Sequence, residues 1–390
     1  MRTWSLLLCV CLSLGGCAAV APPQSPQLAA LLDDGAFPAP AQTPNAASLF
    51  SLSPAMQAHL HSRAFQARLR QDGAARGLLN ALYDKSDLQL DYDATVTRTA
   101  AETYAERSGN CLSLVIMTAA FARELGMQVR FQSVETDETW SRASSLYLVS
   151  DHVNITLAPP MLSQRGFDSE TELTVDFLAP REASRLRAHE LSEADIVALY
   201  LNNRAVEELV GGRSAEAYWW ARAALLARPS VLAAYNTLAV IYQRSGRPLL
   251  AEQVYRAALE RTPDSLVVMQ NLVPLLAANG KAGEAAALAQ RLARLYPAPP
   301  YHYFNQGMDA YKSGNFSQAR TLFAREVARA PYNDEFHFWL GVASFQLGEL
   351  GTAEKQLALA RDTSVRGDTR ERYAAKLAHL RGMGAGTRRH

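Results

Sequence analysis

Residues 232–265 read LAAYNTLAVIYQRSGRPLLAEQVYRAALERTPDS, and their pattern recurs along the C-terminal half of the chain. Prolines, alanines and glycines each return every 34 residues. They are Pro229, Pro263, Pro297 and Pro331, then Ala217, Ala251, Ala285, Ala319 and Ala353, then Gly212, Gly246, Gly280, Gly314 and Gly348. A small residue lets two helices approach closely, a glycine permits the turn between them, and a proline ends the second helix. The period therefore predicts a stack of helix pairs.

A 34-residue unit with these columns resembles the tetratricopeptide (TPR) repeat. The resemblance implies an all-α solenoid of about five units over residues 192–367, followed by a capping helix and tail over residues 368–390. The expected core positions of the quoted unit carry apolar or aromatic residues. These are Tyr235, Leu238, Ala239, Tyr242, Tyr255 and Ala258.

TPR solenoids carry a groove along the first helices of their units, which implies a peptide or protein partner. Candidate groove residues lie on those first helices. They are Asn236, Tyr301, Phe304, Tyr311, Phe338 and Phe345. Packing within the repeats explains each of these residues at least as well.

Residues 1–17, MRTWSLLLCVCLSLGGC, have the features of a signal peptide. Arg2 supplies a positive start, and the following apolar run is too short to span a membrane stably. Leu14-Gly15-Gly16-Cys17 resembles a bacterial lipobox, which implies cleavage before Cys17 and lipid attachment to its thiol. The alternatives are an ordinary cleaved signal peptide or an N-terminal anchor.

Ala18 follows the predicted lipid-bearing cysteine. By resemblance to lipoproteins of Gram-negative bacteria, this residue favours the outer membrane, with the protein facing the periplasm and held to the membrane by its lipid. Residues 18–48 are rich in Ala, Pro, Gln and Ser, a composition that predicts a flexible tether.

The 390-residue chain has a formal net charge of +1, with charges of both signs interspersed. This balance does not favour nucleic acid as a partner. A Gly-rich phosphate-binding loop and a His/Cys ligand set are both missing from the sequence, so we expect neither a cofactor nor a metal.

Cys111 would be the single free thiol of the mature chain, because Cys9 and Cys11 lie in the leader and Cys17 would carry lipid. An unpaired thiol in an exported protein calls for an explanation, and catalysis is one. Cys111 stands at the start of an apolar helix predicted over residues 112–125. Strand-like runs follow at residues 128–134, 145–149, 153–157 and 173–177. One helix followed by several strands predicts an α+β domain over residues 49–191.

A cysteine nucleophile needs a base, and the base needs an acceptor that orients it. The N-terminus of a helix also favours a thiolate. His152 opens one strand-like run and Asp176 lies in the next, so both are candidates for these roles. Taken singly, each residue has a plainer explanation: an inert buried cysteine, a strand histidine and a surface acid.

The segments GNCLSLVIMTAAFARELGMQVRFQSV, DHVNITL and TVDFLAP resemble the transglutaminase-like superfamily, whose arrangement is papain-like. The resemblance implies that Cys111 is the nucleophile, that His152 moves protons and that Asp176 orients the imidazole. Asn110 and Tyr104 are candidates for a second oxyanion donor.

Two functions follow from these predictions. The first is an outer-membrane lipoprotein whose Cys-His-Asp site acts on amide bonds, as a peptidase, an amidase or an acyltransferase. The second is a non-catalytic TPR scaffold for envelope assembly, export or secretion, because such folds can lose their chemistry and keep binding.

Overall fold

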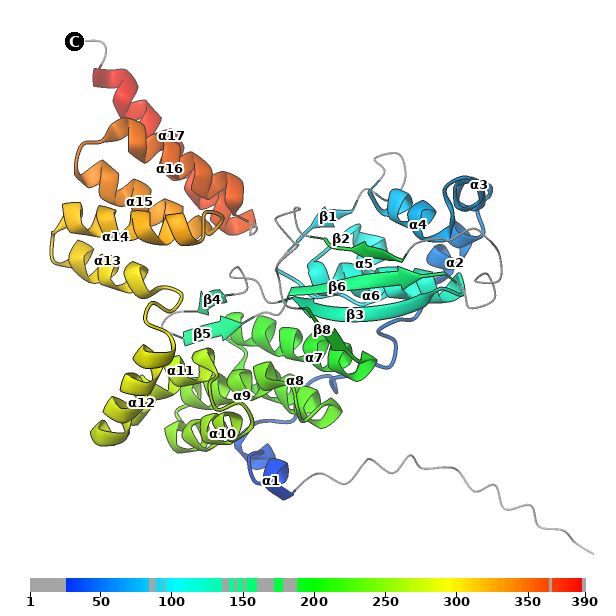
Figure 1. Cartoon of the computed structure of the whole chain (residues 1–390), viewed down its shortest axis with the longest axis horizontal. Coiled ribbons are helices and arrows are strands. Elements are labelled where there is room, and N and C mark those ends of the chain that lie inside the picture. Colours follow the sequence, from blue (N-terminus) through cyan, green and yellow to red (C-terminus); the bar gives the residue numbers. More distant parts are fainter. Residues whose placement is uncertain are drawn as a thin grey trace, which may run out of the picture.

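A computed structural model describes residues 26–83, 88, 90–93, 95–134, 140–143, 146–149, 152–159, 172–177, 188–364 and 367–387. Cys17 and the predicted signal peptide lie outside these residues. The described chain is mostly helical, with a small sheet in its N-terminal half and a long helical array after it (Figure 1).

The sheet-bearing part begins with a group of helices. They are α2 (Pro54–Leu60), α3 (Arg63–Asp72), α4 (Ala74–Tyr83), α5 (Ala100–Glu106) and α6 (Cys111–Glu124). Four antiparallel strands follow in the order β7-β6-β3-β8. Their bounds are Gln128–Val134 for β3, His152–Ala158 for β6, Leu173–Val175 for β7 and Ala188–Leu191 for β8. Two short pairs complete this part: β1 (Asp91–Tyr92) with β2 (Ser108–Gly109), and β4 (Trp140–Ala143) with β5 (Leu146–Val149).

Strand β6 alternates in character, because successive side chains of a strand point to opposite faces. One face carries Val153, Ile155 and Leu157, which join the main apolar core, and the other carries the polar residues from His152 onward. Ile155 pairs with Val175 of β7, so the next residue, Asp176, lies on the same side as His152. Asp176 therefore stands just beyond the end of β7, one residue outside the strand in which the sequence placed it.

The helical array consists of five consecutive antiparallel helix pairs and a final helix. The helices are α7 (Glu193–Val210), α8 (Ser214–Ala227), α9 (Leu232–Arg244), α10 (Pro248–Arg261), α11 (Leu266–Ala278), α12 (Ala282–Leu295), α13 (His302–Lys312), α14 (Phe316–Arg329), α15 (Asp334–Gln346), α16 (Leu350–Thr363) and α17 (Gly367–Thr387). The turn glycine of every pair has φ between 72° and 79°, a left-handed conformation that favours glycine. The alanine column is buried in all five pairs. The predicted repeat is therefore confirmed.

The solenoid falls into two packed blocks that meet at Pro297. One apolar core runs through α7 to α12, and a separate core begins at Tyr301. The Tyr296 hydroxyl donates to the carbonyl of Asp264 in the first block, whereas the carbonyl of Ala298 accepts from Arg329 in the second. Helices α12 and α13 share little packing, and the second block stands apart from the sheet (Figure 1).

Residues 26–48, which we call the strap, pack on the first block instead of forming a flexible tether. The strap contains α1 (Pro26–Ala29) and the 3₁₀ turn Asp34–Ala36 (η1). Its side chains Leu28, Leu31 and Phe37 are buried. The hydroxyl of Tyr242 donates to the carbonyl of Leu31 at 2.9 Å and accepts the backbone N–H of Asp33 at 3.1 Å. The composition suggested a tether because these three buried apolar side chains are few among many polar and small residues.

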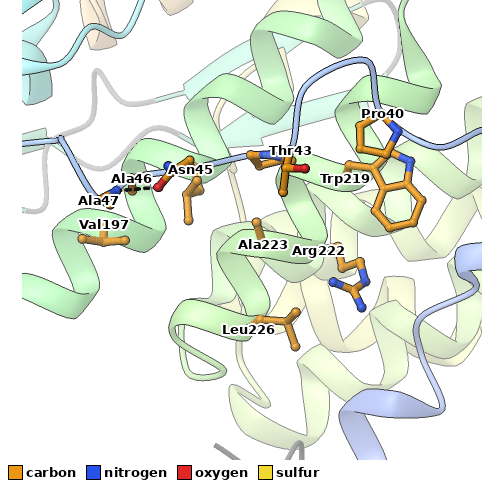
Figure 2. Close-up of a pocket in the computed structure, with 12 residues that line it drawn as sticks. Pro40, Thr43, Asn45, Ala46, Ala47, Val197, Trp219, Arg222, Ala223 and Leu226 are labelled. Atoms are coloured by element: carbon orange, nitrogen blue, oxygen red, sulfur yellow. Dashed lines mark hydrogen bonds between the residues drawn. The ribbon is translucent and has the colours of Figure 1, made fainter. Parts of the chain in front are cut away.

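The later half of the strap crosses α7 and α8 and leaves an open cavity of about 660 Å³ beneath it (Figure 2). The Trp219 indole lies at one end and donates to the carbonyl of Pro38 at 2.6 Å. Arg222 lines the cavity and pairs with Asp34 at 2.8 Å. The strap thus follows the second helix of the first repeat closely.

Candidate functional site

The Cys111 thiol lies at the N-terminus of α6. Asn110 is the N-cap, and its Oδ1 accepts the backbone N–H of Ser113 at 2.9 Å. A Cβ on Gly109 would come within 2.6 Å of the Ser113 Cβ, so a side chain there would force this turn to shift. The sequence Gly109-Asn110-Cys111 therefore fixes the sulfur at the first position of the helix, where unpaired backbone N–H groups gather.

His152 and Asp176 are in direct contact. His152 Nε2 lies 2.8 Å from Asp176 Oδ1, and the imidazole is only 3% exposed. The other ring nitrogen, Nδ1, is buried and has no hydrogen-bond partner among the described residues. The Cys111 thiol acts electrostatically on the same ring, although it makes no hydrogen bond to Nδ1 in this structure. The structure thus brings together the three residues that the sequence singled out.

Two opposing effects set the charge of the imidazole. Burial lowers the pKa of His152, but the hydrogen bond with Asp176 and the interactions with Cys111 outweigh burial and raise the pKa to about 9. At neutral pH the ring is therefore an imidazolium. The proton of a positive ring can be given to a leaving amine.

The pKa of His152 predicts how stability depends on pH. A group whose pKa is raised on folding stabilises the fold fully below its unfolded pKa of about 6.5 and loses that contribution as the pH rises through the folded value. We expect Asp176→Asn to lower the free energy of unfolding by about 1 kcal/mol at pH 6, a small value because Asp176 is 38% exposed. Urea unfolding at pH 6 and pH 9.5 measures the difference, which should shrink at the higher pH. A difference that grows with pH would contradict the assignment.

Asn154 is a buried polar residue near the candidate pair that the sequence did not suggest. It lies on the same face of β6 as His152, it is 7% exposed, and its Oδ1 has no hydrogen-bond partner among the described residues. The alternation in His152-Val153-Asn154 was the signal that could have shown it. A buried unpaired acceptor beside a candidate catalytic pair can receive an N–H group of a bound amide.

The unpaired acceptor also costs stability. We expect Asn154→Leu to raise the free energy of unfolding by about 1 kcal/mol, because the replacement removes a buried polar group that lacks a partner. The matched control is Thr156→Val on the same face, which removes the 2.9 Å bond between Thr156 and Thr174 and should lower stability by about 1 kcal/mol. Urea unfolding of both variants is the measurement, and a destabilised Asn154→Leu variant would contradict the reading.

The two candidate oxyanion donors have other roles. Asn110 caps α6 through its Oδ1, and its side-chain amide donates to Thr97 Oγ1 at 2.7 Å. The Tyr104 ring packs edge-on against His59 and Phe121. The role of either residue as an oxyanion donor stays a prediction.

The predicted groove residues divide into two sets. Asn236, Tyr301 and Phe304 are buried, and their role in a peptide groove stays a prediction. Asn236 Oδ1 accepts a 2.9 Å bond from the Asn271 amide, which joins two first helices. The other residues are half-buried: Tyr311 packs against Phe316 and Trp339, and Phe338 and Phe345 pack on the last core with α16 and α17.

The described residues show neither a metal-binding cluster nor a membrane-spanning helix. They contain no group of three or more His, Cys, Asp or Glu side chains that could hold a metal ion. None of the described helices combines the length and the apolar character needed to cross a membrane.

Comparison with known proteins identifies the helical array. Residues 304–364 match the family described as Tetratricopeptide repeat. The array consists of TPR repeats. Curated protein sequences gave no match to this chain.

Several solved TPR structures are similar to this chain. A TPR protein of Thermus thermophilus is 21% identical, with 46% of this chain and 99% of that chain covered and a TM-score of 0.34. PilF of Pseudomonas aeruginosa is 20% identical, with 48% and 94% covered and a TM-score of 0.31. PilW, described as a type IV pilus biogenesis factor, is 22% identical, with 46% and 92% covered and a TM-score of 0.29.

Proposed function

We propose that this protein is a lipid-anchored TPR scaffold of the bacterial cell envelope that holds a protein or peptide partner. The TPR match carries the proposal, because TPR solenoids offer extended surfaces for proteins and peptides. The first block is partly covered by its own chain, since β5 lies against α9 and α11 (Figure 1). The first helices of the second block, α13 and α15, are the surface that we assign to the partner.

The lipid anchor is tested separately from partner binding. We expect the full-length protein to fractionate with membranes and Cys17→Ser to fractionate with soluble periplasmic proteins. Retention of Cys17→Ser in the membrane fraction would contradict lipidation at this cysteine and would leave the assignment of the repeats intact.

We further propose that the α+β part carries a thiol site that acts on amide bonds. The contact between His152 and Asp176 beside Cys111 favours it, and the resemblance to the transglutaminase-like superfamily agrees with it. The Cys111 sulfur would attack the amide carbon, the C–N bond would break, and the imidazolium would give its proton to the leaving amine. Water or a second amine would then release the thioester, with His152 taking the proton from that nucleophile.

One comparison distinguishes the scaffold from the enzyme. A strain carrying Cys111→Ser is compared with a strain lacking residues 198–367, and partners are captured on purified Cys111→Ala protein. The enzyme predicts loss of function in the Cys111→Ser strain, together with a partner held longer by Cys111→Ala than by wild type. A scaffold alone predicts a wild-type Cys111→Ser strain and loss of function only in the deletion.

A further inference from the structure

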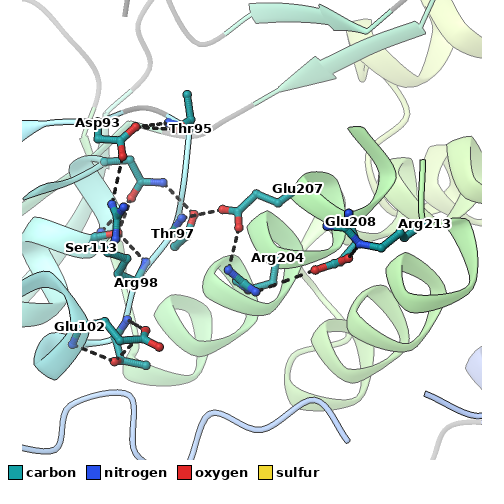
Figure 3. A network of polar contacts seen from close by, with 12 residues as sticks. Asp93, Thr95, Thr97, Arg98, Glu102, Ser113, Arg204, Glu207, Glu208 and Arg213 are labelled. Carbon is teal, nitrogen blue, oxygen red and sulfur yellow. Dashed lines mark hydrogen bonds and ion pairs between the residues drawn. The ribbon is translucent and has the colours of Figure 1, made fainter. Parts of the chain in front are cut away.

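The first repeat helix reaches the turn that holds Cys111. Glu207, on α7, accepts the backbone N–H of Thr97 at 2.6 Å (Figure 3). Thr97 in turn accepts the side-chain amide of Asn110 at 2.7 Å. Asn110 is the N-cap of the Cys111 helix, so two hydrogen bonds separate a TPR helix from the candidate nucleophile.

The Asn110 amide is held at both ends. Its Oδ1 accepts from the backbone N–H and from the hydroxyl of Ser113, at 2.9 and 2.8 Å. The Ser113 hydroxyl also accepts the backbone N–H of Arg98 at 2.9 Å. Thr97 is 1% exposed and Asn110 is 9% exposed, so water cannot easily replace these bonds.

Glu207 itself is held in place on α7. Its second carboxylate oxygen accepts from Arg204 at 2.9 Å, and its side chain is 20% exposed (Figure 3). Burial raises the pKa of Glu207, while the bonds with Thr97 and the charge of Arg204 work against that rise. Removing a carboxylate partly from water costs free energy unless hydrogen bonds replace the lost water. Both oxygens of Glu207 have such a bond, which favours a structural role for this residue.

We infer that Glu207 is a positioning residue for the thiol site: through Thr97 it fixes the Asn110 cap and thereby the position of Cys111 at the start of α6. The inference rests on the proposed thiol site and adds to it that the first TPR repeat is part of the catalytic framework. Small displacements of a reacting group cost reaction rate, so this support should be visible in the reactivity of the sulfur.

The test measures the rate at which iodoacetamide labels Cys111 in the full-length protein at pH 7, together with the melting temperature. Peptide mapping by mass spectrometry assigns the label to Cys111. We expect Glu207→Ala and Thr97→Val to slow labelling by about tenfold or more. Glu207→Gln and Thr97→Ser keep the acceptor oxygens and should recover most of the rate. Glu208→Gln is the control. Glu208 neighbours Glu207 on α7, but it pairs with Arg213 at the start of α8 and lies 3.9 Å from Arg204, whereas the Thr97 N–H bonds to Glu207.

The outcomes separate the inference from the proposed function. Folded Glu207→Ala and Thr97→Val proteins that are labelled at the wild-type rate, while His152→Ala is slow, would overturn the inference and leave the thiol site standing. Equal slowing by Glu208→Gln would also overturn it. Wild-type labelling of His152→Ala would overturn the thiol site itself. If Glu207→Ala does not fold, the labelling rates of Thr97→Val and Thr97→Ser are compared instead, and equal rates for these two variants would overturn the inference.

Discussion

Replacing His152 with alanine should slow the labelling of Cys111 by iodoacetamide at pH 7 by about a hundredfold. The imidazolium is the charged group beside the sulfur, and the thiolate is the species that reacts. Without the ring the sulfur at the N-terminus of α6 would lose that positive charge. Labelling rates of wild type and His152→Ala, followed by mass spectrometry, give the comparison.

His337 supplies a matched control for this experiment. It is also 3% exposed, and both of its ring nitrogens are bonded within the second block, to Gln356 and to the carbonyl of Pro331. His337→Ala should destabilise the protein without changing the labelling rate in the folded state. Equal rates for wild type and folded His152→Ala would show that the imidazole does not activate Cys111.

Replacing Phe37 with alanine should lower the free energy of unfolding by about 3 kcal/mol. The Phe37 ring is buried, stacks on Tyr218 with centroids 4.3 Å apart, and lies beneath the Arg247 guanidinium at 5.0 Å. The loss combines the transfer of an aromatic ring to water with the cavity left between strap and solenoid. Thermal and urea unfolding of the full-length protein are the measurements.

The control for Phe37 is Tyr332→Ala, because the Tyr332 side chain is 52% exposed and its removal should change stability by no more than about 0.5 kcal/mol. If Phe37→Ala costs as little as Tyr332→Ala, residues 26–48 would behave as the flexible tether that their composition suggested.

The solenoid could be predicted because its determinants are local. A turn that needs positive φ requires a residue such as Gly246, and two helices in close contact require a small residue such as Ala251. The structure of each repeat is therefore determined by residues within that repeat. The break at Pro297 could not be predicted in the same way. The break arises because α12 and α13 pack little against each other. The 34-residue spacing of the prolines continues across the break and so gives no sign of it.

The candidate triad could be named because its members follow the chain order of the superfamily that the sequence resembles. Their spacing alone does not require their contact. Other long-range contacts have no comparable pattern in the sequence that would predict them. The bond between Glu207 and Thr97 joins residues 110 positions apart, and the strap bond between Leu31 and Tyr242 joins residues 211 positions apart. The sequence could not separate an N-cap from an oxyanion donor at Asn110, because both roles use the same side chain at the same place.

The titration of His152, followed by NMR, tests the central claim most directly, namely that sulfur, imidazole and carboxylate form one unit. We expect a pKa of about 9 for His152 in wild type, because Asp176 and Cys111 together outweigh burial. Asp176→Asn and Cys111→Ala should each lower that pKa. A wild-type pKa near the ordinary value of about 6.5, unchanged in both variants, would contradict the account.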